Sequence, residues 1–186
     1  MNRSLSDAGT VMGLWGLGSV IGAFFGGKLS DKIGFQKVQV MTLFSGGVMF
    51  IVLGQIHSYG LICVATFILS FVNEAFRPAN SSAIAYYSTP ENRTRSYSLN
   101  RLAVNLGWAV GASLGGLIAA RSYELLFWVD GFTNILAAII MFFAFRTPQN
   151  VYIKPESKEV EIKQSAYKDK TYLWFIFLVV MFGMCF

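Results

Sequence analysis

The stretch GGKLSDKIGFQKV, residues 26–38, decides how this chain folds, because it is a short polar break between two long apolar runs. The runs cover residues 8–29 and 36–56, and about 20 apolar residues suffice for a helix to cross a bilayer. Further apolar runs and breaks follow along the chain. We therefore predict an all-α membrane protein with five complete spans and a sixth that is cut short, at residues 8–29, 36–56, 61–86, 97–120, 123–145 and 171–186.

The composition supports a membrane protein and argues against the main soluble classes. Of the 186 residues, 54% are hydrophobic and 13% are charged, whereas about a quarter of the residues in soluble domains are charged. A soluble enzyme, a disordered chain and a small disulfide scaffold are therefore poorly supported. Cys63 and Cys185 lie in apolar runs, His57 is the only histidine, and no Gly-x-x-x-x-Gly-Lys-Ser/Thr phosphate loop occurs. We predict no metal site, no cofactor and no enzymatic activity.

Lysine and arginine are concentrated on one side of the predicted bundle. If successive spans alternate in direction, the connections at residues 30–35, 88–96 and 146–170 share one side, and they and their flanks hold 12 of the 15 basic residues. The opposite side holds Arg3 and Arg121. Since cytoplasmic loops carry an excess of Lys and Arg, we predict that the three connections are cytoplasmic. The net charge of +5 is then a mark of membrane topology, and we expect no nucleic-acid partner.

The polar break at residues 26–38 has the features of a contact between helical bundles. Gly27 permits close approach of a neighbouring backbone, and Gly34 permits the tight turn that a short connection needs. Asp31 stands near a helix C-terminus, where an acid opposes the macrodipole, so we expect it to face a base or the N-terminus of another helix. We interpret the break as a latch between two bundles, formed by Gly27, Asp31, Lys32, Gly34 and Lys37.

The same break resembles the signature between the second and third spans of the major facilitator superfamily, Gly-x-Leu-x-Asp-Arg/Lys-x-Gly-Arg/Lys-Arg/Lys. The matching positions are Gly27, Leu29, Asp31, Lys32 and Gly34. Phe35 and Gln36 stand where the family usually has bases, and Lys37 follows one residue later. The resemblance implies that the predicted helices are the second to seventh spans of a protein that usually has twelve.

The two ends of the chain indicate a piece of a longer membrane protein. Residues 1–7 would lie outside the cell with no span to deliver them, and the last apolar run has no polar flank. We therefore expect at least one span before Met1 and more after Phe186. The predicted domains are most of an N-terminal bundle at 1–145, a charged cytoplasmic linker at 146–170 and the start of a C-terminal bundle at 171–186.

Polar residues form one wide face of the predicted helix at residues 61–86. They are Asn73, Glu74, Arg77, Asn80 and Ser81. A charge at the centre of a span costs roughly 2.5–3.5 kcal/mol on insertion scales, so this face should avoid lipid, and Glu74 and Arg77 can partly neutralise each other. We hypothesise that it lines a watery path, with Glu74 as the protonatable group and Arg77 as its partner or a substrate anchor. The alternative is a structural ion pair between helices. The resemblance favours the path, because the family's fourth span lines its cavity.

The predicted helix at residues 97–120 has a packing face and a polar face. A groove for close helix packing is expected at Gly107, Gly111, Gly115 and Gly116. Arg101 and Asn105 lie roughly opposite, and we assign both to the cavity. The stretch resembles the antiporter signature of the family's fifth span, Gly-x-x-x-Gly-Pro-x-x-Gly-Gly, with Ala112 in place of Pro. A similar ladder at Gly18, Gly22 and Gly26 is also expected to serve packing.

Taken together, these features and the resemblance predict a secondary active transporter. It would export a small solute across the plasma (inner) membrane by alternating access, and the export would be coupled to protons. We expect the complete protein to be a monomer whose other partners are protons and the lipid bilayer. Two alternatives remain open. One is proton-coupled uptake, for instance of peptides, because FRPAN at residues 76–80 loosely resembles a stretch of peptide carriers. The other is a membrane receptor or assembly protein that transports nothing.

Asp130 and Asn134 share a face of the predicted helix at residues 123–145, and both are expected to have a structural or interfacial role.

Overall fold

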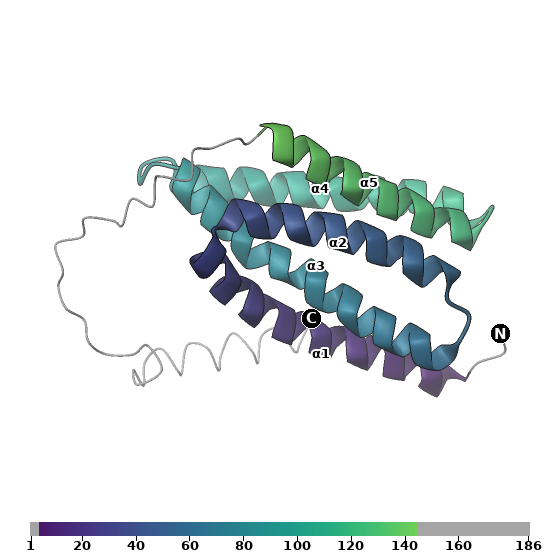
Figure 1. Cartoon of the computed structure of the whole chain (residues 1–186). Coiled ribbons are helices and arrows are strands. Elements are labelled where there is room, and N and C mark those ends of the chain that lie inside the picture. Colours follow the sequence, from purple (N-terminus) through teal and green to yellow (C-terminus); the bar gives the residue numbers. More distant parts are fainter. Residues whose placement is uncertain (1–3, 145–186) are drawn as a thin grey trace. The chain divides into compact units, whose positions relative to one another are not determined.

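The computed structural model describes residues 4–144, which form five helices and no strand. All five helices are long and apolar enough to cross a membrane. The predicted all-α membrane fold is therefore confirmed, whereas the linker at 146–170 and the run at 171–186 lie outside the described residues. In chain order the helices are α1 (Leu5–Ile33), α2 (Phe35–Gln55), α3 (Tyr59–Tyr87), α4 (Arg93–Ala119) and α5 (Tyr123–Ala144), as Figure 1 shows.

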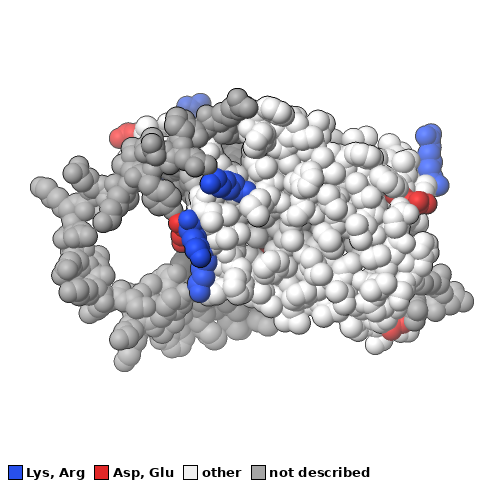
Figure 2. Space-filling view, viewed as in Figure 1, with Lys and Arg blue, Asp and Glu red and all other residues white. Residues whose placement is uncertain are grey.

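Successive helices run in opposite directions, so the α1–α2 and α3–α4 connections lie at one end of the bundle (Figure 1). On the face shown in Figure 2, charged side chains gather at the two ends and the surface between them is uncharged. Large apolar side chains are exposed on the helices, such as Phe24 at 54% and Leu117 at 69%. An apolar belt between charged ends is the surface that a bilayer requires.

Gly34 alone separates α1 from α2. Its φ of +92°, a value that side chains disfavour, ends α1, and its N–H donates to the Ser30 carbonyl at 3.0 Å. The expected connection at residues 30–35 is therefore wrong in extent, because Asp31 and Lys32 lie in the last helical turn. Polar residues do not end a helix by themselves, whereas a glycine in this conformation does.

Close packing between α1 and α3 depends on the glycine ladder of α1. Gly18, Gly22 and Gly26 are buried, and a methyl group on any of them would clash with α3. At Gly26, for example, the added carbon would lie 2.5 Å from the Ala75 Cα. The two backbones are in contact along this seam, and the packing role expected for this ladder is confirmed.

Two glycines also allow α2 and α5 to meet closely. A methyl group on Gly47 would lie 2.7 Å from the Gly131 carbonyl oxygen, and one on Gly131 would lie 2.8 Å from the Gly47 carbonyl oxygen. Helix α2 thus packs between α3 and α5. Helix α4 differs from the other four, because none of its residues is buried among the described residues.

The α3–α4 connection is shorter than the sequence indicates. Its non-helical part is Ser88–Asn92, and α4 begins at Arg93, inside the predicted loop at residues 88–96. Local hydrogen bonds fold the turn, in which the Thr89 N–H donates to the Asn92 side-chain oxygen at 2.9 Å. Pro78 lies inside α3 without ending it.

Candidate functional site

An ion pair lies midway along α3. The Arg77 Nε donates to Glu74 Oε2 at 2.9 Å, with the two residues one helical turn apart. The Glu74 side chain is 18% exposed and that of Arg77 is 71% exposed. The carboxylate is thus largely shielded while the guanidinium reaches the open side of the helix.

The polar face predicted on α3 is divided between two surroundings. Asn73 faces α2, where a methyl group on Gly46 would lie 2.6 Å from the Asn73 side-chain oxygen. Asn80 also faces inwards, whereas Arg77 and Ser81 are exposed. The polar face is wider than the surface that α2 covers. The edge with Asn73 and Asn80 therefore packs against α2, whereas the edge with Arg77 and Ser81 stays open. The structure therefore does not bring Asn73 and Asn80 together with the ion pair.

A ladder of amides joins α2, α3 and α4 near the end of the bundle that carries the α3–α4 turn. Gln39 donates to Asn80 at 3.5 Å, and Asn80 donates to Asn100 at 3.2 Å. Gln39 is only 4% exposed. Sequence reasoning missed Gln39 and Asn100, although an amide within an apolar run could have indicated a buried partner.

Next to the ladder lies a cavity of about 250 Å³. Among residues 4–144 no charged side chain lines it. The hydroxyl of Ser88, one of the lining residues, is buried and has no hydrogen-bond partner in this part of the chain. The lining residues are Gln36, Gln39, Asn80, Ala83, Ile84, Tyr87, Ser88, Ser96 and Met141. The cavity thus has both polar and apolar lining, and the exposed Arg77 is not part of it.

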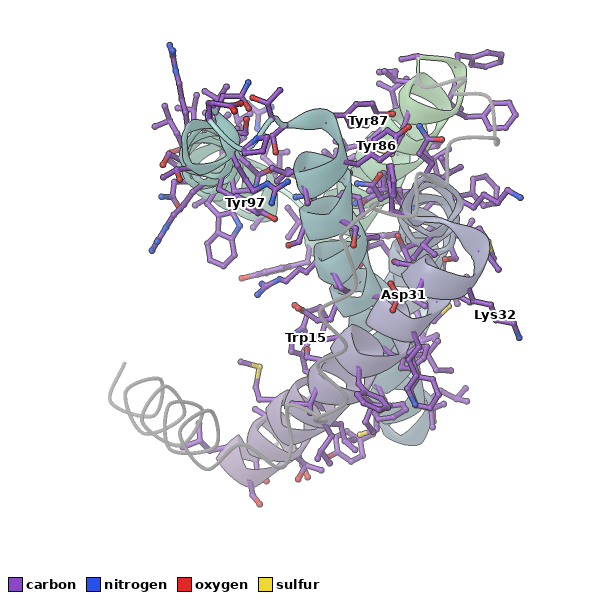
Figure 3. The ribbon with its side chains drawn as sticks, turned by 90° about the vertical axis from the view of Figure 1, so that its left-hand side faces the viewer. Trp15, Asp31, Lys32, Tyr86, Tyr87 and Tyr97 are labelled. Atoms are coloured by element: carbon purple, nitrogen blue, oxygen red, sulfur yellow. The ribbon has the colours of Figure 1, made fainter. Side chains whose placement is uncertain are left out.

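The side chains assigned to the cavity on α4 stand apart from the ion pair. Arg101 and Asn105 are exposed, and within residues 4–144 neither side chain forms a hydrogen bond or ion pair. The contact of α4 with α3 lies further towards the turn, where the Tyr97 hydroxyl donates to the Ser81 carbonyl at 3.1 Å (Figure 3). The cavity roles of Arg101 and Asn105 stay predictions.

The glycine groove of α4 is mostly open. Among the described residues nothing lies within 4 Å of a methyl group placed on Gly107, Gly111 or Gly116, and one on Gly115 would lie 3.6 Å from Leu126 Cδ1. The packing role of these four glycines also stays a prediction.

The latch residues lie in the last two turns of α1, at Gly34 and in the first turn of α2. Figure 3 views the bundle from the end that carries this turn and labels Asp31 and Lys32. Lys32 projects outwards from the last turn of α1, where a base complements the helix macrodipole, and Asp31 precedes it (Figure 3). Gly27 faces α3, because a methyl group there would lie 3.9 Å from Pro78 Cβ. Lys37 is exposed on the first turn of α2. The group thus spans both sides of the Gly34 turn.

Three aromatic rings pack together beside this turn. The centroid of Phe35 lies 5.4 Å from that of Tyr86 and 6.1 Å from that of Tyr87. The two tyrosine rings are 5.0 Å apart in an edge-to-face arrangement. The Gln36 side chain donates to the Tyr87 hydroxyl at 2.9 Å. The first turn of α2 is thereby joined to the last turn of α3.

Two of the weaker candidates have local partners. The Asn134 side chain donates to the Asp130 carbonyl at 2.9 Å, within α5. His57 is exposed, and its ring nitrogen lies 2.9 Å from the Gln55 carbonyl. Within residues 4–144 no group of three or more His, Cys, Asp or Glu side chains is placed to hold a metal ion.

Several known proteins are similar to this chain in sequence. The sequence profile of the Major Facilitator Superfamily matches residues 1–186. The chain is 30% identical over 143 residues to the multidrug resistance protein MdtG of Proteus mirabilis, and 32% identical over 154 residues to the uncharacterized MFS-type transporter YttB of Bacillus subtilis. It is 24% identical over 144 residues to the quinolone resistance protein NorA of Staphylococcus aureus.

These matches cover 76%, 80% and 77% of this chain but only 36%, 37% and 37% of the three relatives. The chain thus spans less than half the length of the curated relatives it matches. The family profile nevertheless extends over every residue, including the latch motif and the helix that carries the ion pair. The chain is therefore a multi-pass membrane protein that belongs to the Major Facilitator Superfamily of transporters.

Proposed function

We propose that this chain is part of a secondary active transporter that exports small molecules in exchange for protons. The observation that carries this proposal is the Glu74–Arg77 pair, a shielded carboxylate bound to an exposed guanidinium midway along a membrane-crossing helix. Charged groups at this depth are expensive, and they occur mainly where a solute or proton path needs them. The relatives named for multidrug and quinolone resistance support export of small molecules.

Glu74 would couple proton movement to conformation in this mechanism. When Glu74 is ionised, the pair with Arg77 is neutral as a whole. Protonation of Glu74 removes its attraction to Arg77 and leaves one positive charge on the helix. The two protonation states therefore favour different surroundings for α3, so proton binding can shift the balance between inward-open and outward-open states. The latch at Asp31 and its neighbours would stabilise one of these states.

Proteoliposomes that contain the full-length carrier provide the test. An acidic interior should drive accumulation of an exported drug by exchange, whereas a symporter would require an alkaline interior. We expect Glu74→Gln to abolish the pH dependence of transport driven by a proton gradient. Movement of the drug down its own concentration gradient should continue in this variant. Glu91→Gln is the matched control, since Glu91 lies in an exposed turn. An unchanged pH profile in Glu74→Gln would remove Glu74 from coupling.

The latch is tested by the rate of the same transport reaction. Asp31→Asn removes a charge and leaves the size of the side chain almost unchanged. We expect slower transport at equal expression, because the state closed to the cytoplasm would be less stable. Equal rates in Asp31→Asn and the unmodified carrier would exclude this role.

The end that carries the α1–α2 and α3–α4 turns is proposed to be cytoplasmic. It holds Lys28, Lys32, Lys37, Arg93 and Arg95, whereas Arg121 stands at the opposite end. A membrane-impermeant maleimide added to intact cells should therefore label His57→Cys and leave Glu91→Cys unlabelled. The reverse result would invert the topology.

A further inference from the structure

The turn between α1 and α2 is attached to α3 by uncharged side chains. Phe35 follows Gly34 directly, and its ring contacts Tyr86 and Tyr87, the last two residues of α3. The ring distances of 5.0–6.1 Å lie within the range of favourable aromatic pairs. These rings come from segments about 50 residues apart, so the contact is tertiary.

A hydrogen bond fixes the orientation of this contact. The Gln36 side-chain nitrogen donates to the Tyr87 hydroxyl at 2.9 Å, which is a normal length for such a bond. Ring packing alone tolerates sliding, whereas a directed hydrogen bond beside it selects one register. Phe35 and Gln36 thus act together on the same end of α3.

This contact joins the turn that carries the latch to the helix that carries the ion pair. Asp31 and Lys32 are separated from Phe35 only by Ile33 and Gly34, so the last turn of α1 and the first turn of α2 have little freedom to move apart. On α3, Tyr86 lies nine residues beyond Arg77. The two residues are therefore about 14 Å apart along the helix axis, at a rise of 1.5 Å per residue. A displacement of α3 at the ion pair would therefore reach the latch turn directly.

We propose that Phe35, Gln36, Tyr86 and Tyr87 form an anchor that positions the latch turn on the end of α3 and so links the latch to the helix that carries Glu74 and Arg77. The anchor contains no charge, so its strength should vary little with ionic strength, unlike a latch held by ion pairs alone. The inference rests on the proposed transport function for its role in rate, but the contact itself can be tested without transport.

A labelling experiment tests the contact in the full-length carrier. Ile33→Cys places a half-buried thiol on the last residue of α1. We expect Phe35→Leu and Tyr86→Leu to raise its rate of maleimide labelling about threefold or more, and Tyr86→Phe, which keeps the ring, to leave the rate unchanged. The matched control is Tyr123→Leu, an interfacial tyrosine that is 74% exposed at the opposite end of the bundle.

Tyrosines also collect at membrane interfaces for reasons of solvation alone. If that were the whole explanation, Tyr86→Leu and Tyr123→Leu would behave alike and the labelling rate would not respond to Phe35→Leu. This result would overturn the anchor. A non-additive effect of Gln36→Ala and Tyr87→Phe in a double-mutant cycle of labelling rates would support the hydrogen bond as part of it, and strictly additive effects would exclude it.

Transport kinetics then test the functional role. We expect Phe35→Leu and Tyr86→Leu to lower the maximal rate about two- to tenfold, the range of an aromatic pair, with KM and the pH midpoint unchanged. Faster labelling with an unaltered maximal rate would overturn the link to transport. Faster labelling in a carrier whose transport does not depend on pH would instead reject proton coupling and leave the anchor in place.

Discussion

Helices α1 and α4 carry glycines at the same four-residue spacing, but their surroundings differ. On α1 the ladder of Gly18, Gly22 and Gly26 is buried against the α3 backbone, whereas on α4 the positions of Gly107 and Gly111 are open within residues 4–144. Spacing therefore permits close helix packing without determining it. What closes the α1 seam is a partner helix whose backbone can approach at the matching positions.

The largest effect is expected at the centre of the closed seam. Gly22→Ala places a methyl group against the Phe71 backbone, which cannot move aside as a side chain would. We expect a loss of about 2–3 kcal/mol of stability, at the upper end for overpacking, measured as denaturant-induced unfolding in detergent. Gly13→Ala on the same helix is the control, because nothing lies within 4 Å of a methyl group at that position among the described residues. Equal effects of the two substitutions would contradict the seam.

A smaller loss is expected where α2 meets α5. A methyl group on Gly131 meets the Ile51 side chain and also lies 2.8 Å from the Gly47 carbonyl oxygen. Since Ile51 can change rotamer but the carbonyl cannot, we expect Gly131→Ala to cost about 1–2 kcal/mol in the same unfolding assay. A cost above that of Gly22→Ala would show that α2–α5 is the tighter seam.

For the open glycine groove of α4, the informative result is whether a substitution raises or lowers the stability of the protein. If no helix packs on Gly111, then Gly111→Ala should stabilise α4 by up to about 1 kcal/mol, because alanine is the better helix former. If another span of the carrier fills the groove, the same change should destabilise the protein. Thermal unfolding of the carrier and of the 186-residue chain, compared side by side, would separate the two cases.

The amide ladder should contribute less to the free energy of unfolding than either of the two glycine seams. Asn100→Ala removes the bond from Asn80 that ties α4 to α3, and hydrogen bonds between membrane helices are worth about 0.6 kcal/mol on average. Asn105→Ala, on the same helix, has the same gain in helix propensity but removes no hydrogen bond within the described residues, so it should be more stable than Asn100→Ala by about that amount. Indistinguishable variants would mean that the ladder does not hold α4.

The smallest effect concerns the turn that precedes α4. A hydrogen bond from the Thr89 side chain lowers the pKa of the exposed Glu91 carboxyl, and the Glu91 backbone N–H adds to this. A lowered folded-state pKa means that the contribution to stability is present above the unfolded value of about 4.3 and is lost as the pH falls through the folded value. The difference in melting temperature between the protein and Glu91→Gln should therefore disappear on acidification. A difference that persists would contradict the hydrogen bond.

The sequence was sufficient to predict five membrane spans, because the length of an apolar run is a local property. It was less informative about helix ends, since Ser30, Asp31 and Lys32 are polar yet continue α1 up to Gly34. Hydropathy does not report the backbone conformation that ends a helix, whereas a glycine can indicate it.

The candidate site was predicted only in part for a different reason. Periodicity placed Asn73, Glu74, Arg77 and Asn80 on one wide face, and the Glu74–Arg77 pair is present. Which edge of that face α2 would cover depends on tertiary packing, as do the partners of Asn80 in the amide ladder. A single sequence contains no direct information on such contacts.

The one-residue turn at Gly34 also fixes the rotational phase of α2 relative to α1. Each residue added to a helix rotates the rest of that helix by about 100°, so one inserted residue before Phe35 would turn Gly47 away from Gly131 if it extended either helix. The turn at residues 88–92 has several residues that can absorb such a change. Length variants of the two turns should therefore differ sharply in tolerance, and among homologous carriers insertions should accumulate before α4 and be absent before α2.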